Sequence, residues 1–185
     1  KLVVLKENML KNHGYFRHAT KNGMRGIVTC EEGVFAFVPP EKEDGKWEID
    51  TLLEQPVSDA VLLDLDGDGQ EELVALAPFH GGRTTVYHHS EKGFVPVYNY
   101  DGNVDFAHAI CACEICGVPT VVIGYRKGNR YLISICFDKE TKEYNATVLD
   151  KDVGSANVMH DIVDGRDILI SANREINEVA YYIIT

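Results

Sequence analysis

A nine-residue acidic segment, residues 64–72, carries the residue types that bind a hard cation. It reads Asp-Leu-Asp-Gly-Asp-Gly-Gln-Glu-Glu, so carboxylates stand at its first, third and fifth positions. In a tight loop such carboxylates converge on one centre, and a carbonyl at position 7 and a carboxylate at position 9 can complete a shell of oxygen ligands. The sequence therefore predicts a calcium site with the ligands Asp64, Asp66, Asp68, Gln70 and Glu72.

The segment does not follow the EF-hand pattern. That pattern places a bidentate Glu at position 12 and helices on both sides. Here position 12 is Ala75, and strand-like runs flank the segment. Two interpretations remain open: a structural calcium ion that stiffens a turn between strands, or a metal-free Asp/Gly-rich hairpin whose carboxylates accept hydrogen bonds from backbone amides.

Histidine or aspartate recurs at one position of a weak internal repeat. Four segments begin with an apolar residue, any residue, His or Asp, and then Ala or Asp; they are residues 16–19, 57–60, 106–109 and 158–161. Their third positions are His18, Asp59, His108 and His160. If the repeats are arranged as a ring, equivalent side chains lie at one level around its axis, and three imidazoles and a carboxylate would converge there.

Such a ring suits Zn²⁺ or another divalent metal, which lowers the pKa of a bound water toward 7 and permits hydrolysis or proton abstraction. Without a metal, neutral imidazoles can serve as acid and base. The alternative is structural: each polar residue hydrogen-bonds the backbone of the neighbouring repeat. His80 and Arg83, in the segment His-Gly-Gly-Arg, are further candidates for contact with a ligand, unless they only form a hairpin turn.

Runs typical of β-strands follow each of these openings, separated by polar turns. The second runs are 26–30, 72–77, 119–124 and 167–172; the third runs are 34–38, 84–88, 131–137 and 178–185; the fourth runs are 46–53, 93–98 and 143–149. No long apolar period of 3.6 residues is present, so helices are minor. Short strands in units of 40 to 50 residues predict an all-β chain, a β-propeller with four blades of mostly four antiparallel strands.

The sequence predicts one domain over residues 1–185, with blades at about 14–55, 56–99, 100–149 and 150–185. The last unit stops after its third strand. A strand at residues 1–7 could supply the missing outer strand, which would close the ring and remove two exposed sheet edges. The alternative is that the chain is a fragment of a larger propeller.

The segment 57–99 resembles the FG-GAP/VCBS repeat of β-propellers. The resemblance rests on the opening Val-Ser-Asp-Ala, the strand after it, the acidic segment and the apolar strands that follow. It implies that the acidic loop lies between the first two strands of a blade and holds calcium. The other three units lack this loop, and the blade count is below the usual six to eight.

Composition excludes several classes of partner. Against 29 Asp and Glu stand 18 Lys and Arg, a net charge of −11, so no basic stripe for nucleic acid is expected. The same charge opposes an anionic membrane surface, and no apolar run approaches the roughly 20 residues of a membrane span. The five cysteines favour reduced thiols and a cytoplasmic location, whereas the family resemblance also allows an extracellular one.

The expected function is therefore a ligand- or protein-binding propeller module, with a small molecule, carbohydrate or protein at its axial face. The alternative is a metal-dependent carbohydrate lyase, dehydratase or hydrolase that uses the same ring of His and Asp.

Overall fold

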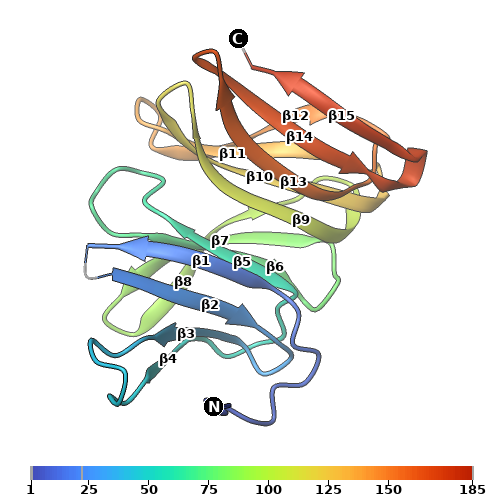
Figure 1. Cartoon of the computed structure of the whole chain (residues 1–185). Coiled ribbons are helices and arrows are strands. Elements are labelled where there is room, and N and C mark those ends of the chain that lie inside the picture. Colours follow the sequence, from blue (N-terminus) through green and yellow to red (C-terminus); the bar gives the residue numbers. More distant parts are fainter. Residues whose placement is uncertain (1, 22, 185) are drawn as a thin grey trace.

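The computed structural model describes residues 2–21 and 23–184, which form four antiparallel sheets of consecutive strands (Figure 1). The first blade contains β1 (Tyr15–Thr20), β2 (Gly23–Thr29), β3 (Val34–Val38) and β4 (Glu48–Leu53). The second contains β5 (Asp59–Leu63), β6 (Glu72–Ala77), β7 (Arg83–Ser90) and β8 (Gly93–Tyr100). The third contains β9 (Val104–Ile115), β10 (Val118–Gly128), β11 (Leu132–Asp138) and β12 (Glu143–Asp150). The fourth contains β13 (Ser155–Val163), β14 (Arg166–Asn173) and β15 (Glu178–Ile183).

The predicted all-β architecture of four blades is confirmed. In each blade the chain runs from an inner strand (β1, β5, β9 or β13) outward through its neighbours in sequence order. Every residue of β6 is buried because both faces of this sheet pack against neighbouring blades. The outer strands β8 and β12 contain only exposed and half-buried residues, as expected for strands with one face in water.

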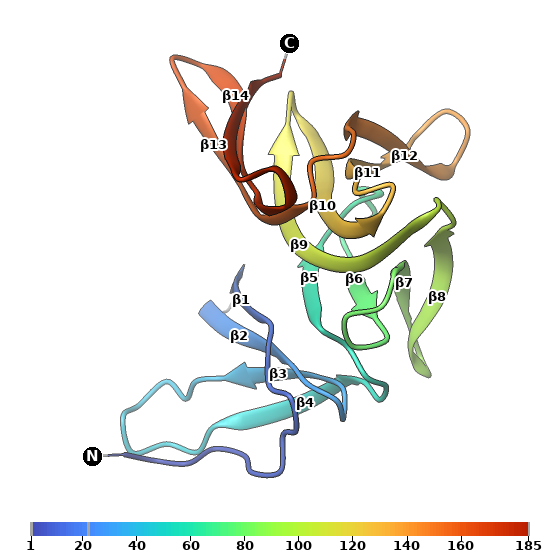
Figure 2. The same cartoon turned by 90° about the vertical axis from the view of Figure 1, so that its right-hand side faces the viewer.

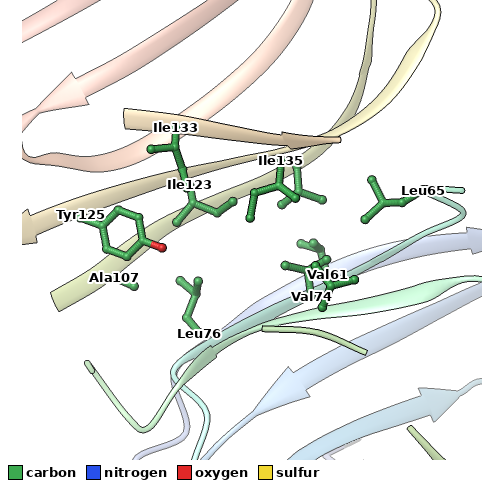
Figure 3. Close-up of a cluster of buried hydrophobic side chains, with 11 residues drawn as sticks. Val61, Leu65, Val74, Leu76, Ala107, Ile123, Tyr125, Ile133 and Ile135 are labelled. Atoms are coloured by element: carbon green, nitrogen blue, oxygen red, sulfur yellow. The ribbon is translucent and has the colours of Figure 1, made fainter. Parts of the chain in front are cut away.

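Apolar layers between consecutive blades hold the arrangement together. Between the second and third blades, Val74 and Leu76 from β6 face Ile123 from β10 and Ile135 from β11 (Figure 3). Complete burial of each such side chain stabilises the fold by roughly 1.5–3 kcal/mol. Two further layers lie between the first and second blades and between the third and fourth blades.

The N-terminal residues do not close a ring, so this part of the prediction is wrong. Residues 2–14 contain no strand, and the fourth sheet remains three-stranded. Instead the N-terminal segment packs on the outer face of the first blade, where Met9 contacts the cluster of Phe35 and Phe37 and the Lys6 ammonium lies 4.6 Å from the centre of the Phe35 ring. Met9 is half-buried on this apolar surface, residues 2–8 are exposed, and the segment lies at the other end of the molecule from β15 (Figures 1 and 2).

Within the described residues, each blade packs against the next blade along the chain, and the first blade does not pack against the fourth in this way. In this part of the chain the helical structure is one 3₁₀ turn, Arg174–Ile176. No helix here is long and apolar enough to cross a bilayer. All five cysteines are free thiols; Cys111 and Cys113 pack in the apolar layer between the third and fourth blades.

Candidate functional site

The acidic loop, residues 64–72, joins β5 to the first residue of β6 in the second blade. Its backbone turns twice through positive φ, at Gly67 (79°) and Gly69 (90°), where glycine avoids the strain that a Cβ would introduce. Asp64 accepts hydrogen bonds from both amides, Gly67 N at 2.8 Å and Gly69 N at 3.1 Å. The carboxylates of Asp64, Asp66 and Asp68 are therefore drawn inward, and one oxygen from each lies within 4.8 Å of the others.

Glu72 is the buried member of this group. Its Oε2 accepts hydrogen bonds from Leu65 N at 2.7 Å and Asp66 N at 3.3 Å. Burial raises the pKa of Glu72 to about 7, and the neighbouring carboxylates of Asp66 and Asp64 also raise it. A buried carboxyl among like charges is a position where a bound cation would lower the electrostatic free energy.

A second set of ligand-type atoms, from Asp66, Glu72 and His88, also lies within 4.8 Å of one another. His88 Nε2 is 2.7 Å from the hydroxyl of Tyr144 and 3.8 Å from Asp66 Oδ2. The side chain of Gln70 hydrogen-bonds Asp68 Oδ2 at 3.4 Å, so it lies beside the carboxylates.

The four residues predicted to share one axial level do not share it. In the antiparallel pairing of the first two strands of each blade, Asp59 lies opposite Leu76, near the end of β6. His18 lies opposite Arg25, near the start of β2. His160 pairs with Leu169, in the middle of β14. The short opening motif shifts by three or four residues between blades, so equal motif positions are not equal ladder positions.

His18 and His160 each face a carboxylate instead. His18 Nε2 lies 2.6 Å from Glu71 Oε1, and Arg25 contacts the other oxygen of Glu71 at 2.8 Å. Burial lowers the pKa of His18, while the charge of Glu71 acts in the opposite direction. His160 Nε2 lies 2.6 Å from Asp167 Oδ1. Because Glu71 belongs to the acidic loop, His18 lies at the acidic-loop end of the molecule.

In the first blade His13 makes the inter-blade contact that His108 makes in the third, although the four-residue motif does not include it. His13 N donates to Thr29 O and Ser58 N donates to Leu76 O, both at 3.0 Å, so His13 and Ser58 occupy the same place in their blades. Gly14, not a strand-forming residue, follows His13. Lys11 stands where the motif has its apolar residue and Gly14 where it has Ala or Asp, so the motif does not mark this position.

Both histidines link their blade to the next one. His13 Nδ1 donates to Ser58 O at 3.0 Å, and His108 Nδ1 donates to Ala156 O at 2.8 Å. His108 lies at a β-bulge, because Ala109 pairs with Gly124 while Ala107 pairs with Tyr125. For His108, the structure thus shows the inter-blade hydrogen bond that the structural interpretation expects.

His13, His80 and His108 form an imidazole cluster at the end of the blades opposite the acidic loop. Their ring centres are 4.7 Å apart for His13 and His80, and 5.7 Å apart for the other two pairs. His80 comes from the β6–β7 loop, and its buried Nδ1 has no hydrogen-bond partner among the described residues. An unsatisfied buried nitrogen costs about 1–3 kcal/mol, which a ligand on this ring could recover.

Two phenylalanines frame the imidazole cluster. His80 is stacked on Phe106, with ring centres 4.8 Å apart, and meets Phe79 edge-on at 4.4 Å. The Arg126 guanidinium lies over Phe106 at 4.9 Å and is paired with Glu175 at 2.9 Å.

Burial shifts the pKa values of three groups in this region. Burial lowers the pKa of both His80 and His108, and nearby positive groups, including Arg126, lower it further. Burial raises the pKa of Asp59 to about 6, while a hydrogen bond from Ala60 N and the charge of His13 oppose that rise. Arg83, predicted as a ligand contact, is the exposed first residue of β7 and lies opposite Ala77 in the pairing of β6 with β7.

No protein-family model matches the chain, and no curated protein matches it.

His108→Ala is expected to destabilise the fold by about 1–3 kcal/mol, because Ala156 O loses the donor that satisfies it between two blades. His13→Ala is the matched control and should cost less, because Ser58 O keeps the Thr29 hydroxyl as a donor at 2.8 Å. Urea denaturation of both variants measures the difference. Equal and negligible losses would contradict the inter-blade role of His108.

Proposed function

We propose that this chain is a ligand- or protein-binding β-propeller module whose binding face is the end that carries the imidazole cluster. The supporting observation is the gathering of His13, His80 and His108 around Phe79 and Phe106, contributed by three blades. Aromatic rings beside imidazole nitrogens provide stacking surfaces and hydrogen-bonding groups together. That combination suits a carbohydrate or a peptide, and the ligand belongs to one of these two classes.

The proposal includes a structural calcium ion in the acidic loop. It is supported by the three carboxylates within 4.8 Å of one another and by the buried Glu72 beside them. The loop carbonyls and carboxylates form a set of hard oxygen donors that suits calcium. The ion would stiffen the turn between β5 and β6, at the opposite end from the binding face.

We also propose that the second blade is a repeat of FG-GAP/VCBS type. The acidic loop joins the first two strands of that blade, which is the place that the resemblance implies. The other three blades have short turns there.

The enzyme alternative loses its geometric basis. It required His18, Asp59, His108 and His160 to face one axial site. His18 and His160 pair instead with Glu71 and Asp167, at other levels of their blades.

The test is an amide ¹H–¹⁵N titration with two probe sets, neutral oligosaccharides and short peptides, in calcium-containing buffer. Binding by the proposed face predicts shifts confined to amides around Phe79, His80 and Phe106. They should be lost in His80→Ala and kept in His89→Ala, whose imidazole is on the exposed side of β7. Shifts at another face, no shifts with either set, or hydrolysis or elimination of an oligosaccharide would overturn the proposal.

A further inference from the structure

We propose that Asp66, Glu72 and His88 bind one divalent transition-metal ion of the Zn²⁺ class. This goes beyond the proposed function, which assigns only a calcium ion to the acidic loop. The new position lies on the side of the loop that faces the third blade, where His88 meets Tyr144 of β12. It combines one imidazole nitrogen with carboxylate oxygens, and it shares only Asp66 with the calcium position.

The ligand atoms around the acidic loop form two clusters and not one. In the first, one oxygen from each of Asp64, Asp66 and Asp68 lies within 4.8 Å of the others. Glu72, which the sequence predicts as the last calcium ligand, is grouped within the same distance with Asp66 and His88 instead. Asp66 can serve both clusters, because its Oδ1 accepts a hydrogen bond from Asp68 N at 3.0 Å while its Oδ2 lies 3.8 Å from His88 Nε2.

Strand pairing holds Glu72 and His88 side by side. Leu73 pairs with Tyr87, so Glu72 and His88, the next residue of each strand toward the loop, lie opposite each other on β6 and β7. Residues directly opposite in antiparallel strands point to the same face of the sheet. Two of the three ligands therefore stand on rigid strands, and the acidic loop brings Asp66 to them.

The distances suit a small ion. Zn²⁺ binds carboxylate oxygen and imidazole nitrogen at about 2.0–2.2 Å, so two ligand atoms of one ion lie roughly 3.4 Å apart at tetrahedral angles and at most about 4.4 Å. The 3.8 Å between His88 Nε2 and Asp66 Oδ2 falls within this range. An imidazole favours Zn²⁺ and its neighbours in the transition series, whereas calcium takes oxygen ligands.

The negative charge at this position is not balanced by the protein. Among the described residues no Lys or Arg forms an ion pair with Asp66 or Glu72, and the basic group closest to pairing is His88, 3.8 Å from Asp66. The Lys139 ammonium lies over Gly67 instead. A divalent ion would supply the missing positive charge.

Glu72 gives the strongest reason for a cation, because its side chain is only 2% exposed. Burial raises its pKa to about 7, and the charges of Asp66 and Asp64 act in the same direction. A buried carboxylate among like charges is stabilised by a bound cation. Together with calcium, a second divalent ion brings four positive charges to the four carboxylates of Asp64, Asp66, Asp68 and Glu72.

An open groove leads to the position. His88 and Tyr144 line it together with Tyr98 and Phe137, between the outer strands of the second and third blades. Three protein ligands leave the fourth place of a tetrahedral ion to water or to a bound molecule that enters by this groove. Coordination would replace the hydrogen bond between His88 Nε2 and the Tyr144 hydroxyl, at 2.7 Å. Burial and the charge of Glu72 raise the pKa of this hydroxyl, so it stays protonated and can donate to a carboxylate instead.

The experiment titrates calcium-saturated protein with Zn²⁺ by calorimetry. We expect one equivalent of Zn²⁺ to bind, because the two ions share only Asp66. In His88→Ala the affinity should fall at least about 100-fold, since loss of a direct ligand costs no less than loss of an orienting group. A long-range ¹H–¹⁵N imidazole spectrum gives a second readout, in which Zn²⁺ should shift Nε2 of His88 and leave His89 unchanged.

Three variants separate this ion from calcium. Asp68→Asn alters the calcium cluster alone, so it should reduce the rise of the Tm with calcium and retain wild-type affinity for Zn²⁺. His88→Ala should do the reverse. His89→Ala is the matched control and should change neither response, because its imidazole is on the exposed side of β7. Circular dichroism checks that each variant is folded.

The proposal is overturned if the wild type does not bind Zn²⁺ in saturating calcium, if His88→Ala binds Zn²⁺ as tightly as the wild type, or if Asp68→Asn loses Zn²⁺ binding as well. In each of these cases a rise of the wild-type Tm with calcium, and oligosaccharide or peptide binding at the imidazole cluster, would leave the proposed function standing.

Discussion

Calcium added to EDTA-treated protein is expected to raise its Tm by about 5–10 °C. A ligand that binds only the folded state at 100 times its Kd stabilises that state by about 2.7 kcal/mol. For a chain of 185 residues, each kcal/mol shifts the Tm by roughly 2–4 °C. Differential scanning calorimetry, in EDTA and at increasing calcium concentrations, measures the shift.

Asp66→Asn should abolish this shift, because Asp66 contributes to both groups of clustered ligand atoms. The neutral amide oxygen can still accept the hydrogen bond from Asp68 N, so the turn itself is preserved. Asp138→Asn is the matched control: Asp138 accepts hydrogen bonds from Glu140 N and Thr141 N in a turn of the third blade. A calcium response that is unchanged in Asp66→Asn, or absent in wild type, would refute the calcium site.

Glu72→Gln is expected to stabilise the protein in EDTA at pH 8 by up to about 3 kcal/mol. The pKa of Glu72 is raised from 4.5 to about 7 in the folded state, mainly by burial and then by the charges of Asp66 and Asp64. A raised carboxyl pKa means that stability is present below pH 4.5 and is lost as pH rises through 7. A shift of 2.5 pKa units corresponds to about 3 kcal/mol, and glutamine avoids this loss because it has no charge to bury.

The sign of this effect should reverse with calcium. In EDTA at pH 5 the advantage of Glu72→Gln should fall below about 1 kcal/mol, because Glu72 is then protonated in the folded state and ionises only in the unfolded state. In saturating calcium at pH 8, wild type should be the more stable, since Glu72→Gln removes an anionic oxygen from the site. Urea denaturation under these three conditions tests the set. A variant that is less stable than wild type in EDTA at pH 8 would show that the ionised carboxylate is favourable in the fold.

The architecture could be predicted from the sequence because strand signals are local. The runs 34–38 and 72–77 coincide with β3 and β6, and the third runs of all four units and the fourth runs of the first three overlap observed strands. Alternation of apolar and polar residues between Gly- and Asp-rich turns is enough to define such strands. Their repetition in units of similar length indicates blades.

Closure and register could not be predicted in the same way. Residues 2–7 have a strand-like composition, but in the structure they are exposed and pair with no strand. Register depends on bulges, such as the one at His108, and on pairing across the ladder. A motif of four residues does not encode either of these, so the motif predicts one level for His18, Asp59 and His160, whereas the ladders place His18 and His160 at other levels.

What the sequence determined by itself is therefore the acidic loop and the strands around it, because their residues are neighbours in the chain and close on one another within a single turn. The tertiary structure decided the imidazole cluster. His13, His80 and His108 are 95 residues apart from first to last (108 − 13) and come from a segment before β1, a loop and a bulged strand. They meet only because the apolar layers between the first three blades hold those elements side by side.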